Sequence, residues 1–183
     1  MDPGAPSAPA DAPALIDSAV LVPAYRDAAG ALRLVLIRRG ALGVHAGMLA
    51  FPGGKCDPGD ATRCDTALRE AWEEIGLAPE RVAVLAQLPV AETLTSGFRV
   101  FPFLARVEKP AQWRPDPREV SEVVEADAAE LARPQAHGEA PMPFPAGPRV
   151  TPYIQVGPYR LWGVTYRILN PLLPRLLAGE WPL

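Results

Sequence analysis

Three glutamates close together in the chain have the residue type and spacing for chemistry: Glu70, Glu73 and Glu74. On an α-helix they share one side, because side chains three and four residues apart lie on the same face. Carboxylate oxygens are the ligands that Mg²⁺ and Mn²⁺ prefer, and these cations usually also bind substrate phosphates. An ordinary solvated acidic face is the alternative, since like charges one turn apart cost only about 0.2–0.5 kcal/mol.

The loop before these glutamates favours the metal site. Residues 51–54 read Phe-Pro-Gly-Gly, and an Asp-Pro-Gly-Asp turn follows at residues 57–60. A glycine pair lets the backbone approach a ligand closely. A glycine loop that leads into a helix with three carboxylates is typical of a site that holds a cation against a phosphate.

The helix that positions the glutamates is predicted over residues 61–75. Gly76 follows as a C-cap, and Pro79 comes soon afterwards. At about 100° per residue, one arc of this helix is apolar and opposes the glutamates. We expect that arc to face the core, through Leu68, Ala71, Trp72 and Ile75.

The rest of the chain predicts grouped strands with helices between them. Residues 18–25 and 32–38 read as a hairpin, and residues 82–90 and 98–107 as further strands. An acidic stretch at 119–131 precedes a Pro/Gly-rich loop at 134–148. A second hairpin turns around Gly157, and Pro171 and Pro174 break or kink a last helix at 161–177. This order favours a mixed α/β (α+β) layer fold over a doubly wound parallel sheet.

Composition limits the function classes. The chain has 183 residues and a net charge of −3, which argues against a nucleic-acid partner. No apolar run approaches the roughly 18 residues that span a membrane. Two cysteines and two histidines are too few for a Cys/His zinc cluster. We expect residues 1–15 to form a flexible Ala/Pro-rich arm and residues 16–183 a single domain. Because residues 1–14 do not read as a secretory signal, we expect a cytoplasmic protein with two free thiols.

The glutamate segment resembles the signature of the Nudix hydrolases. Residues 69–77, Arg-Glu-Ala-Trp-Glu-Glu-Ile-Gly-Leu, match its second half at every defined position, and Gly54 stands at its start. Asp60 replaces the usual early Glu, one residue further from Arg69, where the family's acid would form a salt bridge to the Arg. The resemblance implies a Nudix-type mixed sheet sandwiched between helices. It also implies metal-dependent cleavage of a nucleoside diphosphate linked to another group.

Residues 51–60 and 66–70 are similar to the coenzyme A pyrophosphatase branch of that family. In the preceding signature of the branch, Arg38, Gly47 and residues 51–54 match, whereas Arg39 stands where Ser is usual and Gly43 where Arg is usual. Residues 116–120 and 159–165 also look like this branch. The resemblance implies hydrolysis of coenzyme A or a derivative to 4′-phosphopantetheine and adenosine 3′,5′-bisphosphate. The alternatives are a Nudix hydrolase of ADP-ribose, dinucleotides or nucleoside triphosphates, and a non-catalytic Nudix-like binding module.

The resemblance also implies roles for the acidic residues. Glu70 and Glu74 would be the principal ligands of Mg²⁺ or Mn²⁺, with Glu73 as a further or water-mediated ligand and the Gly53 carbonyl completing the shell. Glu74 would also be a candidate general base, and Glu73 a further catalytic residue. A carboxylate of the later loop, Glu119 or Glu122, is the other candidate base, unless these two are surface charges.

The basic and aromatic candidates are fewer. Arg38, Arg39 and Lys55 would bind phosphates of a small nucleotide substrate, and the arginine pair would suit the 3′-phosphate of coenzyme A. The alternative is that they are ordinary cations at the edge of a loop. Arg69 would position carboxylates. Tyr159 and Trp162 would line a pantetheine pocket or pack the last helix, and His45 would be a solvent-facing loop residue.

Overall fold

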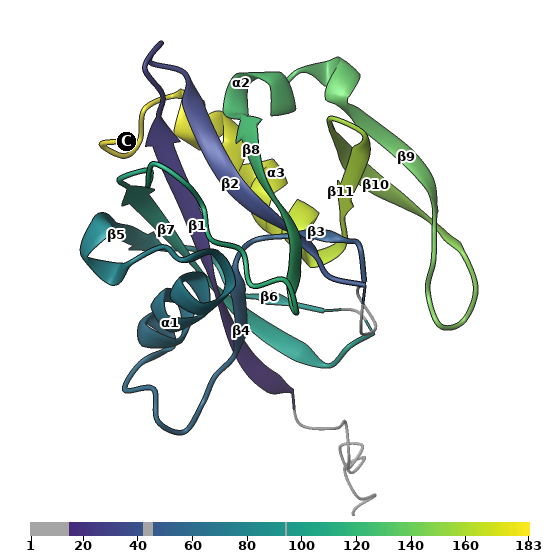
Figure 1. Cartoon of the computed structure of the whole chain (residues 1–183). Helices are drawn as coiled ribbons and strands as arrows, with labels where there is room; N and C mark the ends of the chain where they lie inside the picture. The colour runs from purple at the N-terminus through teal and green to yellow at the C-terminus, as the bar shows by residue number, and fades with distance from the viewer. Residues whose placement is uncertain (1–14, 42–45, 94) are drawn as a thin grey trace, which may run out of the picture.

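The computed structural model describes residues 15–41, 46–93 and 95–183 (Figure 1). Residues 1–14 of the predicted arm lie outside this part of the chain, as do Gly43 and His45. Within it, no helix is long and apolar enough to cross a membrane.

An eight-stranded mixed sheet forms the centre of the fold. Its strands are β1 (Ile16–Arg26), β2 (Leu32–Arg39), β3 (Leu49–Ala50), β4 (Gly53–Lys55), β5 (Val82–Gln87), β6 (Ala91–Glu92), β7 (Phe98–Val107) and β8 (Val120–Asp127). The order along its main path is β3-β2-β1-β7-β5, and β4, β6 and β8 pair with β1, β7 and β2. β1 and β7 are parallel, whereas β1 and β2 form the predicted antiparallel hairpin. The predicted mixed fold is therefore confirmed.

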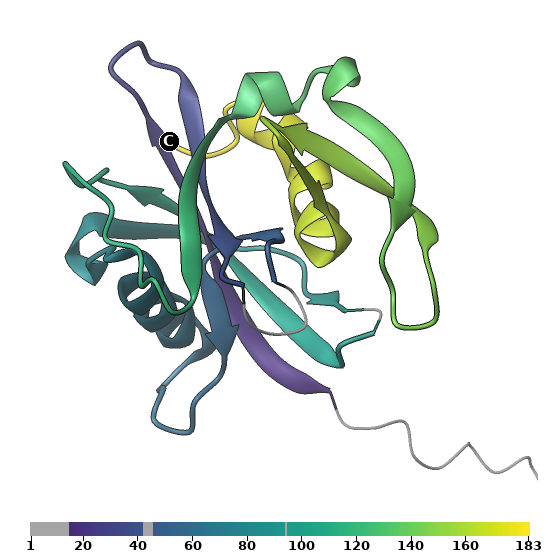
Figure 2. The same ribbon diagram turned by 45° about the vertical axis from the view of Figure 1, so that its right-hand side comes forward.

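Helices cover both faces of this sheet (Figure 2). Along β2 the side chains alternate between two separate cores. Val35 and Ile37 pack with α1 (Arg63–Ile75), whereas Leu34 and Leu36 pack with α3 (Gly163–Leu177). The face on which a β2 residue lies therefore decides which half of the molecule it meets.

A second sheet of three antiparallel strands lies beside α3: β9 (His137–Met142), β10 (Arg149–Val156) and β11 (Tyr159–Trp162). The predicted hairpin around Gly157 is confirmed. The predicted loop at residues 134–148 is wrong over β9 and over the short 3₁₀ turn Pro134–Ala136. β9 tolerates Pro141 because it lies at the edge of its sheet, where one side of the strand needs no hydrogen-bond partner.

Helix α3 continues through Pro171 and Pro174, so the break that was one of the two expected effects does not occur, and the kink stays a prediction. Its apolar side chains supply the compensating stabilisation, since Ile168, Leu169, Leu172, Leu173 and Leu176 are all buried in the core of that face.

The predicted acidic stretch at 119–131 becomes strand β8 followed by the short helix α2 (Ala128–Leu131).

Helix α1 begins and ends close to the predicted residues. Thr62 is its N-cap and forms a capping box with Asp65, and Gly76 ends it in the left-handed conformation. Ala71 and Ile75 are buried as expected, but Trp72 is half exposed and Glu74 is buried. The predicted core arc is therefore wrong by part of a turn, because the helix also rests its glutamate side against β4.

Candidate active site

The glycine pair of residues 53 and 54 lies in β4, which pairs with β1 close to α1. Gly53 has a φ of 155°, and a Cβ at this position would lie 2.3 Å from the Ala19 carbonyl oxygen. No other residue fits there without moving β1. Gly53 therefore allows the loop to lie directly against the central strand.

Gly54 has a different reason to lack a side chain. A Cβ on Gly54 would lie 2.4 Å from Oε1 of Glu70. The Glu70 carboxylate thus rests on the bare backbone of β4, in the place that any larger residue would fill. Burial raises the pKa of Glu70, and the charges of Glu73 and Glu119 raise it further.

Glu74 is the most buried of the three glutamates, with 2% of its side chain exposed. Its Oε2 accepts a hydrogen bond of 2.8 Å from the Gly53 backbone N–H, and its Oε1 lies 3.8 Å from Nη1 of Arg39. Burial raises the pKa of Glu74 to about 7, although the Gly53 amide and Arg39 oppose the shift. The charges of Glu70 and Glu119 add to it, so several carboxylates act on one another here.

Arg69 joins the carboxylates of the loop and the helix. Its Nε and Nη2 donate to the two oxygens of Asp60 at 3.0 Å each, and its Nη1 donates to Glu70 at 2.9 Å and to Glu73 at 3.1 Å. Asp60 thus forms the salt bridge to Arg69 that the family's early acid would form, and Arg69 positions carboxylates as predicted. The Arg69 guanidinium, helped by a hydrogen bond from Thr66, holds the pKa of Asp60 far below its usual range.

Glu73 does not join the other two glutamates. Its side chain is 55% exposed, and it forms an ion pair with Arg69 one turn earlier. In the described part of the chain, no group of three or more His, Cys, Asp or Glu side chains forms a ready cluster for a metal. The structure therefore brings Glu70 and Glu74 together at the glycine pair, where the charge of Glu119 raises the pKa of both. Glu73 lies at the exposed edge of the site.

The two carboxylates predicted for the later loop separate. Glu119 precedes β8, its backbone carbonyl accepts from Gly40, and its charge acts on Glu70 and Glu74. Glu122 lies in β8 opposite Arg38, and its Oε2 accepts a 2.5 Å hydrogen bond from the Tyr159 hydroxyl. Glu119 thus remains a candidate base, whereas Glu122 is engaged on the other side of the sheet.

The side chains of the two predicted arginines, Arg38 and Arg39, have different neighbours. A β-bulge interrupts the register of β2 and β8 between Arg38 and Arg39. Arg39 reaches Glu74 on the α1 side, whereas the Arg38 guanidinium lies 5.0 Å from the ring centre of Tyr159 in β11. Lys55 is exposed beside the glycine pair, 5.8 Å from the ring centre of Phe98. Arg38 and Arg39 lie on opposite faces of β2, because neighbouring strand residues face opposite ways, and phosphate binding by these residues stays a prediction.

Thr66 is a further residue of the Asp60–Arg69 contacts. It is fully buried and donates a 2.7 Å hydrogen bond to Asp60, a role that its position six residues along the chain does not signal.

The two predicted aromatic residues have different neighbours. Tyr159 contacts Arg38 and Glu122 instead of packing α3 alone. Trp162 packs edge-to-face on Phe144, with ring centres 5.5 Å apart.

The residues of this site lie within a segment that matches a known protein family. A model of the NUDIX domain matches residues 16–143, which include the glycine pair, all of α1 and the Glu119 loop. The chain belongs to the Nudix family. The match ends at the start of the second sheet's β9–β10 turn, so Tyr159 and α3 follow the matched residues.

Curated relatives of this Nudix chain carry the name "Uncharacterized Nudix hydrolase NudL". The protein from Pectobacterium atrosepticum is 44% identical over 93 residues, which are 50% of this chain and 48% of the relative. The protein from Klebsiella pneumoniae is 41% identical over 116 residues, 63% of this chain and 59% of the relative. The chain thus matches about half to three fifths of the length of these relatives.

Solved structures share the fold at low identity. A Nudix hydrolase from M. smegmatis, RenU, superposes with a TM-score of 0.60 at 17% identity, and covers 93% of this chain and 89% of that one. A MutT/nudix family protein from Enterococcus faecalis gives a TM-score of 0.59 at 16% identity, over 95% of this chain and 65% of that one. These neighbours support the Nudix fold and nothing finer.

The residues of the site fit the divalent cation that the Nudix fold implies. Glu70 and Glu74 offer hard oxygen donors at the glycine backbone, and their raised pKa values show carboxylates whose charge burial disfavours. Mg²⁺ is usually bound through one or two carboxylates and substrate phosphates, without an all-protein cage. Glu70 and Glu74, the two predicted principal ligands, are therefore a sufficient set of carboxylates, and the further or water-mediated role of Glu73 stays a prediction.

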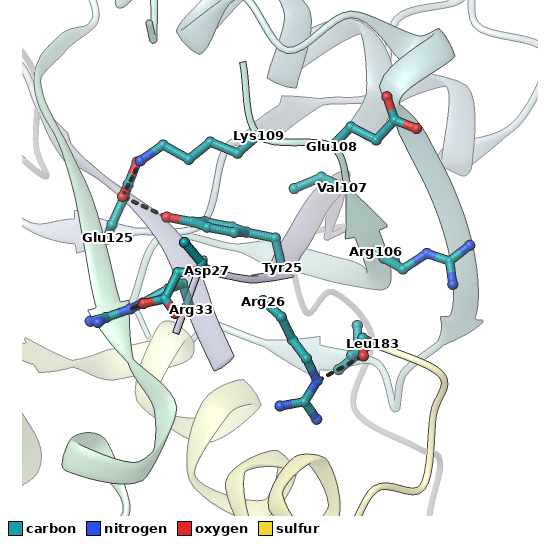
Figure 3. Close-up of a pocket in the computed structure, with 11 residues that line it drawn as sticks. Tyr25, Arg26, Asp27, Arg33, Arg106, Val107, Glu108, Lys109, Glu125 and Leu183 are labelled. Carbon is teal, nitrogen blue, oxygen red and sulfur yellow. Dashed lines mark hydrogen bonds and ion pairs between the residues drawn. The ribbon is translucent and has the colours of Figure 1, made fainter. Parts of the chain in front are cut away.

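A separate hollow of about 720 Å³ opens at the β1–β2 turn, lined by Tyr25, Arg33 and Lys109 among others (Figure 3). Several of its polar groups pair with one another: Glu125 accepts from the Tyr25 hydroxyl at 2.6 Å and from Lys109 at 2.7 Å. Arg39 and the glutamates lie at the other end of β2. This hollow is therefore not part of the candidate active site.

Proposed function

We propose that the chain is a metal-dependent Nudix pyrophosphohydrolase whose substrate is coenzyme A or a derivative. The products are 4′-phosphopantetheine and adenosine 3′,5′-bisphosphate. The observation that carries the proposal is the contact of Glu70 and Glu74 with the bare backbone of Gly53 and Gly54. This arrangement presents two carboxylates and a glycine loop at one point, as hydrolysis of a pyrophosphate requires.

The catalytic roles follow from this geometry. A divalent cation, Mg²⁺ or Mn²⁺, supplies charge neutralisation of the phosphate oxygens and a lower pKa for the attacking water. Glu70 and Glu74 would hold it, with the Gly53 carbonyl and, through water, Glu73 as further ligands. Arg69 and Asp60 keep Glu70 in place. Glu119, near these two glutamates, is our proposed base, and Glu74 is the alternative.

Arg39 and Lys55 are the proposed phosphate-binding residues of the reacting end. Arg39 stands beside Glu74, so its guanidinium offers a charge to a phosphate held there. Lys55 follows the glycine pair directly. We further propose that residues 16–183 form one domain, because one core joins both sheets and α3. A cytoplasmic location completes the proposal, in line with the free cysteines Cys56 and Cys64.

A substrate panel tests the proposal. Coenzyme A, ADP-ribose, a dinucleoside polyphosphate and a nucleoside triphosphate are incubated with Mg²⁺ or Mn²⁺, and products are identified by mass spectrometry. We expect the highest kcat/KM for coenzyme A. A preference for ADP-ribose, dinucleotides or triphosphates would assign the alternative Nudix hydrolase activity. Absence of turnover on all of them would favour a non-catalytic Nudix-like binding module.

Substitution of Glu74 shows whether the site is the one proposed. Glu74→Gln keeps the shape and removes the charge, so turnover should fall by about 10²–10⁴-fold. Glu80→Gln is the matched control, because Glu80 is exposed in the turn after α1 and should leave kcat unchanged. Near-normal activity of Glu74→Gln would mean that the reaction takes place elsewhere.

A further inference from the structure

Arg38 carries a charge that no described carboxylate pairs with. Arg38 and Glu122 face each other across β2 and β8, where opposite charges usually interact. No ion pair joins them in the part of the chain that the structure describes. The Arg38 Nε is also buried without a hydrogen-bond partner there, and a buried donor left in this way costs about 1–3 kcal/mol.

Tyr159 contacts both Arg38 and Glu122. Its hydroxyl donates to Oε2 of Glu122 at 2.5 Å, and its ring lies against the Arg38 guanidinium at 5.0 Å from the ring centre. The tyrosine thus occupies one oxygen of the carboxylate and packs its ring against the cation. Such a contact orients an arginine without neutralising its charge.

The position of Arg38 places this free charge near the reacting end. Arg39, the next residue, reaches Glu74 on the α1 side. Arg38 lies on the opposite face, and a Cβ on Gly47 would be 3.9 Å from its Nη2, so the guanidinium borders the loop that leads to the glycine pair. A substrate that crosses the end of β2 from Glu74 would meet Arg38 with its distal part.

We infer that Arg38, kept apart from Glu122 by Tyr159, binds an anionic group of the substrate that is remote from the scissile pyrophosphate. Arg39 alone serves the reacting end, and Tyr159 is a positioning residue. The inference rests on the proposed function, because the 3′-phosphate of coenzyme A is such a group. The substrate preference is therefore set in part by β11 of the second sheet, which follows the residues matched by the family model.

The first experiment compares coenzyme A with dephospho-coenzyme A, which lacks the 3′-phosphate. In the wild type we expect a higher kcat/KM for coenzyme A. Arg38→Gln should reduce this preference by about tenfold or more, mainly through KM. Arg39→Gln should lower kcat/KM for both substrates alike. An equal loss on both substrates in Arg38→Gln would overturn the inference.

The second experiment tests the role of Tyr159. Tyr159→Phe keeps the ring but frees Glu122 to pair with Arg38, so the preference for coenzyme A should fall several-fold. The double variant Tyr159→Phe/Glu122→Gln has no carboxylate to pair with Arg38 and should regain the preference. Tyr153→Phe is the matched control, because Tyr153 has the same kind of contact with Arg160 in the same sheet, at 4.9 Å. Failure of the double variant to recover would refute the positioning role.

Binding without turnover separates failure of the inference from failure of the proposed function. Calorimetry with adenosine 3′,5′-bisphosphate and with AMP needs no hydrolysis. If the wild type does not cleave coenzyme A but prefers the bisphosphate, and Arg38→Gln loses that preference, the anion site is supported and the proposed reaction is wrong. Equal binding of both nucleotides to the wild type would overturn the anion site.

Discussion

The surroundings of the Glu74 side chain disfavour its ionised form. It is buried, and its neighbours include two further carboxylates, so its pKa rises to about 7 from an ordinary 4.5. A carboxyl with a raised folded pKa favours the folded state when it is protonated. Its stabilising contribution is present below about pH 4.5 and is lost as the pH rises to about 7.

We therefore predict that Glu74→Gln stabilises the protein when EDTA removes divalent cations. The gain in the free energy of unfolding should be about 1–3 kcal/mol at pH 8 and should vanish near pH 4. Urea denaturation at several pH values measures it. Mg²⁺ or Mn²⁺ should stabilise the wild type and not the variant. A metal-free variant that is less stable than the wild type at pH 8 would contradict this account of Glu74.

The two site glycines should respond differently to alanine. In Gly54→Ala the new Cβ meets the flexible end of Glu70, so the chain should fold and turnover should fall at least tenfold. In Gly53→Ala the Cβ meets the backbone of β1, and φ is unfavourable for alanine, so the folded yield itself should fall. Circular dichroism and kcat distinguish the two. Folding and activity equal to the wild type in both variants would contradict the roles given to Gly53 and Gly54.

Residue types at the site were predictable, but their burial was not. A helical pattern gives the angles between Glu70, Glu73 and Glu74, and these proved sufficient to place two of them together. It does not say which arc meets the protein. Trp72 looked like a core residue by hydrophobicity, yet it is half exposed, because α1 turns its small side chains and Glu74 toward the sheet.

At the scale of elements, the junction of the 57–60 turn with α1 depends on Asp60. Asp60 receives both Arg69 nitrogens and the Thr66 hydroxyl, and its lowered pKa keeps it ionised. A carboxyl with a lowered folded pKa stabilises the fold above its unfolded pKa of about 3.8. That contribution is lost as the pH falls further toward the folded pKa.

We predict that Asp60→Asn lowers the free energy of unfolding at pH 7 by about 1–3 kcal/mol. It should also lower kcat, because Arg69 then no longer holds Glu70. The stability difference from the wild type should shrink below about pH 4. Asp57→Asn is the control in the same turn, since Asp57 only accepts from the Gly59 amide and asparagine can do the same. A pH-independent difference would show that charge is not the cause.

Element boundaries followed local signals closely where the signals were strong. The β1–β2 hairpin and α1 lie within a few residues of their predicted positions, because turn and cap residues mark their ends. The prediction of a loop at residues 134–148 was wrong because the local signals there were misleading. Their prolines and glycines read as a loop, whereas pairing with β10 stabilises β9 through contacts that no local pattern contains.

For the whole molecule, the Nudix family match ends at residue 143, but the core does not. Helix α3 and strands β10 and β11 bury Ile154, Leu161 and Leu169 in the same core as Leu34 and Leu36 of β2. We predict that a chain truncated after residue 143 does not fold cooperatively. Thermal unfolding by circular dichroism, compared with the full chain, measures this. A sharp transition in the truncated chain would contradict a shared core.

The sequence predicted the architecture of the molecule better than the contacts of Arg38. The Nudix signature is local and therefore readable. The contact of Arg38 with Tyr159 spans more than a hundred residues, and the role of Thr66 depends on how the loop folds back. Such pairings arise from the arrangement of two sheets, which a single sequence specifies only through packing.

The location of Tyr159 on a separate small sheet gives the proposed site contributions from two distant parts of the chain. The glutamates proposed to hold the metal come from one part, and the neighbour proposed to orient Arg38 comes from another. A chimaera that exchanges the β10–β11 turn between relatives, while keeping the buried residues of α3, would then transplant ligand choice without altering bond cleavage. Diversification of such enzymes would require few changes, all of them far from the signature helix.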